Sequence, residues 1–451
     1  MEPIRSRAER AFRTLKEDRS LRSILGRAGW LTSANGLTIV LGAIQGALTA
    51  RLLGVAGWGS LAIALSFSSI ISLFLSFQMQ EFVVKWVTQF SDDGTARAAT
   101  AFKLALMGEA ASALLAFAIV QMLAGWAASA FAKNPDLAWA FRAVAVITLF
   151  QAGQQSLVGM LQVKHDFRTQ GLIQATSQTA STLGVAVVFF VGGGMAAVVA
   201  VTIGAAALTS AMMWTFGARA ANAVLPSGWL RSKRVRLGGF GREMAKFAFL
   251  GNLRGTLSSA TNSGNLLVLG FLSNPLGVGY YKLATSIAGI ASLPNSPLSA
   301  ASFPDFVAAY RERDWTRFRT LMRRGSAVAA LWFVPASVGL LILARPAIAL
   351  LYGPAFLPAV PALAILLIGV TADGLLYWET NSLLAMGEPG YLATVALVAM
   401  IVKYTLAFLL VPIGGYLVMA AADSFVVIGK NILNARRTLR RLRVEEAMTD
   451  G

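Results

Sequence analysis

The chain has no cysteine and a single histidine, His165, in 451 residues. Disulfides, thiol chemistry and cysteine-ligated metals are therefore excluded, and we expect neither a metal site nor a cofactor. Charged residues are also scarce: they make up 13% of the chain, whereas soluble proteins have about 25%, and hydrophobic residues make up 56%. This composition excludes a water-soluble globule and predicts an integral membrane protein.

Long apolar segments recur from one end of the chain to the other. Each has roughly 20 residues, enough for a helix to cross a hydrocarbon core of about 30 Å. The pattern predicts an all-α polytopic membrane protein with about 12 transmembrane helices. The expected helices cover residues 28–50, 60–82, 101–125, 142–161, 170–191, 195–216, 246–272, 279–301, 326–344, 358–382, 391–411 and 414–433.

The net charge of +18 could indicate a nucleic-acid partner. The positions of the basic residues argue against this interpretation. Most of the 39 Lys and Arg fall in segments that lie on one side of the membrane if the twelve helices alternate in direction. The positive-inside rule assigns this side, and both termini, to the cytoplasm. We therefore expect no nucleic-acid binding. Anionic phospholipids at the cytoplasmic face are the expected partners of these basic segments.

Two passages indicate an internal repeat. Residues 54–64 (GVAGWGSLAIA) are a weak copy of residues 274–284 (NPLGVGYYKLA). The matching residues are Gly57, Gly59 and Ala64 in the first passage and Gly277, Gly279 and Ala284 in the second. Six helices per repeat is an even number, so the halves keep one orientation and are expected to be related by a pseudo-twofold axis along the membrane normal. The expected divisions are a basic N-terminal segment at 1–27, an N-lobe at 28–216, a basic linker at 217–245, a C-lobe at 246–433 and a basic C-terminal tail at 434–451.

Three passages together resemble a known superfamily. They are ARLLGVAGWGSLAIALSFSSIISLF, NPLGVGYYKLATSIAGIASLPNSPLSAASFPDF and ARPAIALLYGPAFLPAVPALAIL. The chain resembles, over about 28–433, the multidrug/oligosaccharidyl-lipid/polysaccharide (MOP) exporters, and within them the polysaccharide and O-antigen flippases. The resemblance implies a bacterial inner-membrane protein, without enzyme activity, that moves an undecaprenyl-pyrophosphate-linked oligosaccharide to the outer leaflet by alternating access. It also implies an ion gradient or membrane potential as the driving force, and glycosyltransferases or a glycan polymerase as neighbours.

Other functions remain open. Multidrug members of the superfamily favour acidic residues in the N-lobe, where the one intramembrane acid is Glu109. Lipid II flippases carry further arginines in the first helix, where this chain has Ile39 and Gln45, and usually have two extra helices. A membrane glycan polymerase would present a large outer loop with catalytic groups, which the spacing of the apolar segments does not provide. A multidrug/cation antiporter is thus the main alternative.

Several helices carry polar residues at helical spacing on an otherwise apolar surface. Amides and hydroxyls suit a cavity for sugars, but they also join membrane helices to one another. In the N-lobe the candidate substrate-binding residues are Asn35, Gln45, Gln151, Gln155, Gln174 and Gln178. In the C-lobe they are Ser258, Asn262 and Asn265, on the same helical face as Arg254.

Basic residues inside membrane helices are costly and are therefore functional candidates. Arg254 is the first choice for binding the pyrophosphate, because it lies about 12 Å inside its helix at 1.5 Å per residue. Lys282, near the outer end of its helix, is expected to draw the phosphate outward, unless it extends to the headgroups as an anchor. Arg51 matches a position where lipid II flippases also have an arginine, although it could equally be an interfacial anchor.

Acidic residues suggest sites for coupling to a proton or sodium gradient. Asp373 and Glu379 lie on the tenth helix, and Glu109 lies on the third. Lys403 and Asp423 are about equally far from the turn near residue 413, so they are expected at the same depth in adjacent helices. A structural ion pair would explain these two residues without a role in transport.

Overall fold

A computed structural model describes residues 19–450, except 77–78, 94, 227, 233–234, 236–239, 245 and 248–263. It describes the side chains of these residues from 36 onward, apart from 91–93, 95 and 449–450. Every regular element in this part of the chain is a helix, as the sequence predicts. The elements are α2 (Arg19–Leu75), α3 (Met79–Asp93), α4 (Thr95–Phe131), η1 (Pro135–Leu137), α5 (Ala138–Phe150), α6 (Gln154–Val163), α7 (Phe167–Val191), α8 (Met195–Val224), α10 (Pro275–Ala291), α11 (Asn295–Arg311), α12 (Trp315–Leu351), η2 (Pro354–Phe356), α13 (Ala359–Leu375), α14 (Trp378–Ala385) and α15 (Pro389–Asp450).

Eight stretches of the described residues are long and apolar enough to span a membrane, and they agree with about twelve crossings. Two of them contain two expected crossings each, because α2 and α15 run through a sharp turn at Gly54 (φ 67°) and Gly415 (φ 59°). Glycine is the residue that adopts this left-handed backbone without strain. The expected helix 246–272 falls largely outside the described residues, and 279–301 is divided between α10 and α11.

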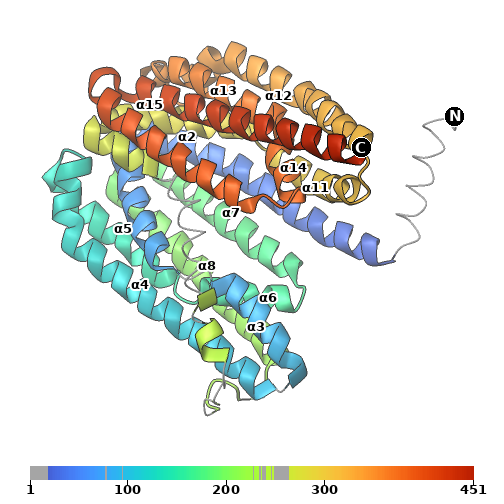
Figure 1. Ribbon diagram of the computed structural model, residues 1–451. Coiled ribbons are helices and arrows are strands. Elements are labelled where there is room, and N and C mark those ends of the chain that lie inside the picture. The colour runs from blue at the N-terminus through green and yellow to red at the C-terminus, as the bar shows by residue number, and fades with distance from the viewer. Residues whose placement is uncertain are drawn as a thin grey trace. The chain divides into compact units, whose positions relative to one another are not determined.

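The first compact unit contains residues 1–49, 68–123 and 140–256. In it α3 and α8 pack on α6, and α7 packs on α8 (Figure 1). Its core is aromatic: Trp86 stacks on Phe90 with ring centroids 5.7 Å apart, and Phe102 meets Trp229 edge-on. Such large rings make many van der Waals contacts, which matter for packing in a membrane because apolar area alone gives helices no preference for each other over lipid.

The second compact unit contains residues 50–67, 124–139 and 257–451. Here α13 packs against α10, α12 and α15, and Figure 1 shows α12, α13 and α15 side by side. The segment 50–67 belongs to this unit because Trp58 packs edge-on against Phe356, with ring centroids 5.8 Å apart. The two expected six-helix lobes were defined by membrane crossings, whereas the two compact units are defined by packing. The lobe boundaries therefore stay a prediction.

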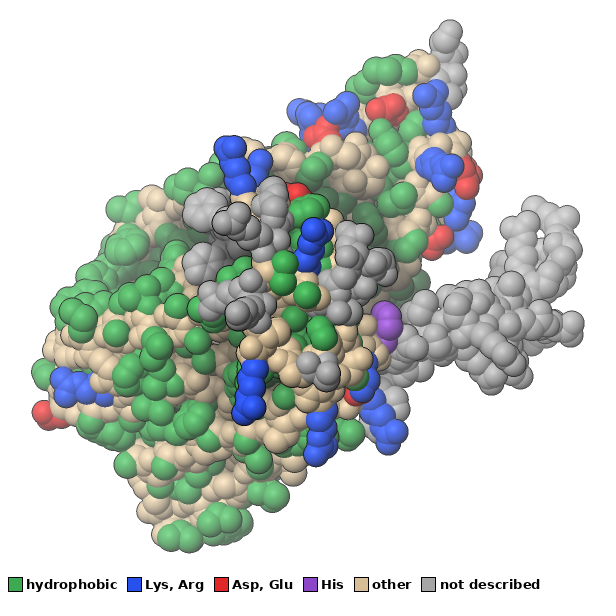
Figure 2. All heavy atoms as spheres, turned by 90° about the horizontal axis from the view of Figure 1, so that it is seen from below, with side chains coloured by type: hydrophobic (Ala, Val, Ile, Leu, Met, Phe, Trp, Pro, Cys, Tyr) green, Lys and Arg blue, Asp and Glu red, His purple; other side chains and the backbone are tan. Residues whose placement is uncertain are grey.

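Large apolar side chains are exposed over much of the surface. Figure 2 shows one face, on which hydrophobic side chains form broad areas while Lys and Arg form separate groups. Phe190 and Ile413 are each 84% exposed, which soluble proteins avoid over wide areas. With the helix lengths, this exposure identifies a multi-pass membrane protein whose apolar surface is solvated by lipid.

Candidate functional site

Several of the expected substrate-binding residues fall outside the described part of the chain. Arg254, Ser258 and Asn262 lie in the undescribed range 248–263, and the side chain of Asn35 is also not described. Their roles stay predictions. The remaining candidate residues are polar side chains that the structure describes within each unit.

In the first unit, two of the expected polar stripes meet each other. Nε2 of Gln178 on α7 donates to Oε1 of Gln45 on α2 at 2.7 Å, and Oγ1 of Thr182 donates to the carbonyl of Leu41 at 3.3 Å. These bonds join α2 to α7, as polar residues between membrane helices commonly do. The two glutamines therefore have a structural role, whether or not they also contact a substrate.

The other N-lobe glutamines differ in exposure. Gln151 and Gln155 are exposed, and Gln174 is half-buried. They have polar groups available for a ligand, and their predicted substrate contacts remain untested.

Glu109, the one acid expected inside the N-lobe, caps a helix. Its two carboxylate oxygens accept the backbone N–H groups of Gln155 and Ser156, at 2.9 and 3.0 Å. These groups belong to the first turn of α6, which begins after Gly153 in the left-handed conformation and has no cap from its own preceding residue. A carboxylate at this position offsets the helix dipole and satisfies two backbone donors. Glu109 therefore has a structural role, and its role in ion coupling stays a prediction.

In the second unit, Asp423 is the centre of a buried polar network. Lys403 of α15 forms an ion pair with it, and the hydroxyl of Tyr281 donates to it. Nδ2 of Asn265 donates to both carboxylate oxygens, at 2.9 and 3.2 Å, and lies 3.0 Å from the Tyr281 hydroxyl. The side chains of Lys403 and Asp423 are 5% and 15% exposed. Charges this well buried persist because each has a partner.

A second network surrounds Asp373 on α13. Its Oδ2 accepts from Nδ2 of Asn295 at 2.7 Å, and its Oδ1 accepts from Nδ2 of Asn431 at 2.9 Å. The aspartate therefore links α11 and α15 through α13. Both amides present donors to it, which fixes the position of the carboxylate within the helix bundle.

Glu379 lies further along the chain, on α14, and is only 3% exposed. Its Oε1 accepts from the hydroxyl of Thr380 at 3.0 Å, and Lys430, Asn434 and Asp373 lie within electrostatic reach. Within the described residues, three buried oxygens here have no hydrogen-bond partner: Glu379 Oε2, Asn431 Oδ1 and Asn434 Oδ1. All three are acceptors, so each lacks a donor, and a proton on the Glu379 carboxyl would supply one.

The two basic candidates differ in their surroundings. Arg51 donates to the carbonyl of Leu350, in the last turn of α12, where a cation also complements the helix dipole. Lys282 lies on α10 and is half-buried, and its backbone carbonyl accepts from Thr285 and Ser286. Arg51 thus has a structural contact inside the unit. The role of Lys282 in binding phosphate stays a prediction.

The sequence analysis missed Tyr281, Asn295, Asn431 and Asn434. Asn431, Asn434 and Thr438 follow the spacing of one helical face, and Thr438 contacts Ser382 at 3.1 Å. Asn434 and Thr438 lie beyond the expected helix limit at residue 433, in the basic end of α15, so the face that they share with Asn431 was not apparent from the expected helices. No group of three His, Cys, Asp or Glu that could hold a metal occurs in the described residues.

The comparisons with known proteins decide the family. Residues 48–361, well over half of the chain, match the family described as polysaccharide biosynthesis protein. The chain belongs to this family. The chain is also similar to the inner membrane protein YghQ of Escherichia coli (strain K12). The two are 22% identical over 347 residues, which cover 76% of this chain and 96% of that protein.

Solved structures with the same fold are transporters. The chain is similar to a multidrug resistance MATE family transporter of the MOP superfamily in an inward-facing conformation, with a TM-score of 0.72, 14% identity, and 91% and 96% of the two chains covered. It is also similar to the lipid II flippase MurJ in an inward closed conformation, with a TM-score of 0.69, 14% identity and 93% of each chain covered. Together with the family match over residues 48–361, these similarities confirm the expected resemblance to MOP exporters, and the chain shares the fold of these two solved structures.

Proposed function

We propose that this member of the polysaccharide biosynthesis protein family is a flippase for an undecaprenyl-pyrophosphate-linked oligosaccharide. The observation that carries the proposal is the family match over residues 48–361 on a chain with a MOP transporter fold. The E. coli relative, an inner membrane protein, supports a location in the bacterial inner membrane, with both termini in the cytoplasm by the positive-inside rule.

The mechanism we propose is alternating access, in which Arg254 binds the pyrophosphate from the cytoplasmic side. A guanidinium suits this role because it forms two parallel hydrogen bonds to phosphate oxygens and stays charged. Lys282 then attracts the same anion toward the outer side. The two cations lie on consecutive expected helices, so a single anionic headgroup can pass from one to the other.

The driving force we propose is a proton or sodium gradient acting through the second unit. Asp373, Glu379 and Asp423 are carboxylates of α13, α14 and α15, and each accepts a hydrogen bond from an amide or hydroxyl. Glu379 is the strongest candidate for ion coupling, because its Oε2 has no hydrogen-bond partner among the described residues. The side-chain oxygens of Asn431 and Asn434 also lack partners there. Asp423 is already neutralised by Lys403, which makes it a weaker coupling residue.

The test of the flippase proposal is transport of a lipid-linked oligosaccharide in proteoliposomes. Arg254→Ala should abolish transport at normal protein level, and Arg254→Lys should retain part of it, because the charge remains while the paired hydrogen bonds are lost. The control is Arg142→Ala, which removes an exposed arginine of α5. Normal transport by Arg254→Ala would refute the assignment of Arg254, and lack of transport by the wild-type protein would refute the function.

A multidrug/cation antiporter is the second candidate, favoured by the TM-score of 0.72 to the MATE transporter. Deletion of the gene would then sensitise cells to cationic drugs and leave the surface glycan unchanged. The flippase proposal expects the reverse pattern. Cell-surface glycan staining and drug susceptibility measured on the same deletion strain therefore separate the two functions.

A further inference from the structure

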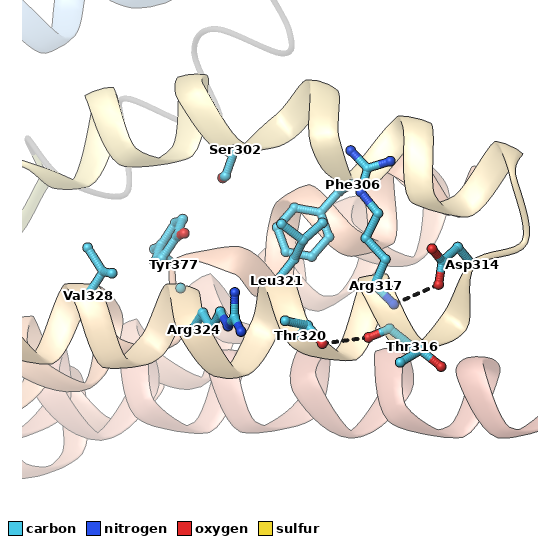
Figure 3. A pocket seen from close by; sticks show the side chains of 11 residues that line it. Ser302, Phe306, Asp314, Thr316, Arg317, Thr320, Leu321, Arg324, Val328 and Tyr377 are labelled. Carbon is cyan, nitrogen blue, oxygen red and sulfur yellow. Dashed lines mark hydrogen bonds between the residues drawn. The ribbon is translucent and has the colours of Figure 1, made fainter. Parts of the chain in front are cut away.

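A pocket of about 540 Å³ opens where α11, α12 and the residue before α14 meet in the second unit (Figure 3). It lies beside the basic segment 311–324, which the charge pattern assigns to the cytoplasmic face. The residues that line it are Ser302, Phe306, Asp314, Thr316, Arg317, Thr320, Leu321, Arg324, Gly325, Val328 and Tyr377.

The two arginines of the pocket have different charge partners. Arg317 forms ion pairs with Asp305 at 3.2 Å and with Glu312 at 3.1 Å, so its charge is already neutralised. Asp314 is also occupied, because its carboxylate accepts the backbone N–H of Arg317 at 2.8 Å as the N-cap of α12. For Arg324, no ion pair or hydrogen bond occurs with any residue that the structure describes. Arg324 is therefore the arginine of the lining that is available to bind an anion, while the carboxylate of Asp314 is held at the N-terminus of α12.

Figure 3 shows the guanidinium of Arg324 directed into the pocket, between Tyr377 and Thr320. Tyr377 adds a hydroxyl that can donate a hydrogen bond, and Gly325 makes room for it, since a Cβ there would lie 2.7 Å from that hydroxyl. Phe306 and Leu321 form an apolar wall. A single cation, a hydroxyl donor and an apolar wall suit a phosphate diester attached to a lipid.

An exposed apolar stripe leads away from this pocket along α12. Arg324, Val328, Leu331, Val338 and Ile342 share one helical face by their spacing. The four apolar members are 60%, 81%, 50% and 71% exposed, in that order. From Val328 to Ile342 the stripe runs roughly 21 Å at 1.5 Å per residue, longer than half of a hydrocarbon core of about 30 Å. An acyl chain of the inner leaflet fits along it.

We propose that this pocket is a binding site for an acidic phospholipid of the inner leaflet. Its phosphate binds Arg324 and Tyr377, and one of its acyl chains lies along Val328, Leu331 and Val338. The single available arginine favours a lipid with one net negative charge, such as phosphatidylglycerol, over a pyrophosphate, which carries more. The site rests on the membrane topology of segment 311–324 and not on which substrate the protein transports.

The experiment measures thermal unfolding of the purified full-length protein in detergent during titration with dioctanoyl-phosphatidylglycerol. The comparison probes are dioctanoyl-phosphatidylcholine, inorganic phosphate and a polyprenyl pyrophosphate. The variants are Arg324→Gln, Arg324→Lys and a matched control, Arg323→Gln, which removes an exposed arginine next in sequence that does not line the pocket. The unfolding temperature of each variant without lipid is measured first, so that a folding defect is recognised.

Phosphatidylglycerol should stabilise the wild-type protein and Arg323→Gln at lower concentrations than phosphatidylcholine does. In Arg324→Gln the phosphatidylglycerol concentration that gives half of the stabilisation should rise by a factor on the order of five to ten. For Arg324→Lys this concentration should lie between those of the wild-type protein and Arg324→Gln. Equal effects of Arg323→Gln and Arg324→Gln would overturn the proposal in favour of diffuse attraction. Stabilisation by phosphate alone would indicate a free-anion site, and tighter Arg324-dependent binding of the pyrophosphate would assign the pocket to the transported lipid.

Discussion

Gly59 and Gly279 contact each other within the second unit, at a distance that excludes any side chain. A Cβ on Gly59 would lie 2.9 Å from the backbone nitrogen of Gly279, and a Cβ on Gly279 would lie 2.8 Å from Cγ1 of Val55. These two glycines occupy matching positions in the repeat that the sequence contains. Equivalent residues touch each other only close to an axis that relates two repeats, so the contact is what the expected pseudo-twofold axis predicts for this pair.

This contact predicts a specific sensitivity to added volume. Gly279→Ala should lower the free energy of unfolding by about 1–3 kcal/mol, because the backbone of α10 must move away from Val55. The measurement is thermal unfolding in detergent. Gly289→Ala is the control on the same helix, where a Cβ meets nothing within 4 Å. It should be neutral or slightly stabilising, since alanine favours helix over glycine. Equal behaviour of the two variants would contradict the tight crossing.

Lys403 and Asp423 provide a test of a structural ion pair against an ion-coupling site. Asp423→Asn should destabilise the protein by about 3–5 kcal/mol, because it leaves a buried lysine without its counter-charge. The double variant Lys403→Met with Asp423→Asn should regain most of that loss. Thermal unfolding measures the stabilities, and proteoliposome transport is followed in parallel. A stable double variant that still transports would confirm a structural pair, whereas a stable variant without transport would assign the pair to coupling.

Lys282 is expected to act on the transported headgroup. Lys282→Gln should slow export while binding of the lipid-linked substrate from the cytoplasmic face persists, because the outer attraction is lost across a low-dielectric cavity. Export rate and substrate binding are measured in the same vesicles. The comparison variant is Lys133→Gln, which removes a lysine that donates to the carbonyls of Ala130 and Phe271 at 2.8 Å and so has a structural role. Unchanged export in Lys282→Gln would make this lysine a membrane anchor.

Glu388 predicts a defined pH dependence of stability. The side chains of Arg437 and Arg441 hydrogen-bond its carboxylate and hold its pKa below the ordinary value of 4.5. A carboxyl whose pKa is lower in the folded state stabilises that state above pH 4.5, and this contribution disappears as the pH falls through the lower folded pKa. The wild-type protein should therefore lose more stability than Glu388→Gln between pH 7 and the acidic range below 4.5.

The contribution of Glu388 to stability should also depend on salt. Both arginines are about 40% exposed, so solvent and salt screen the pair and its contribution should shrink at high ionic strength. Thermal unfolding at low and at high salt measures this. If Glu388→Gln and the wild-type protein lose stability in parallel on acidification, the carboxylate contributes nothing through its two arginines.

The sequence alone determined the class of protein and the helical crossings, and it predicts the repeat. A crossing requires roughly 20 apolar residues whatever its neighbours are, so hydropathy locates it without tertiary information. The match between Gly59 and Gly279 could also be read from the sequence, because close backbone approach tolerates only glycine. The equal distance of Lys403 and Asp423 from the turn likewise predicted that they lie at one depth, and the structure shows the ion pair.

Tertiary structure alone decided which polar group each side chain meets. Gln45 and Gln178 were assigned to polar faces from their spacing, but spacing does not reveal whether such a face borders a cavity or another polar helix, and the two amides bond to each other. Glu109 was expected as an intramembrane acid, whereas the break in the helix at Gly153 supplies it with two backbone donors. The pairing of Asp373 with Asn295 and Asn431 joins residues far apart in the chain. A hydrogen bond depends on a separation of about 3 Å, and only the packing of the helices sets that distance.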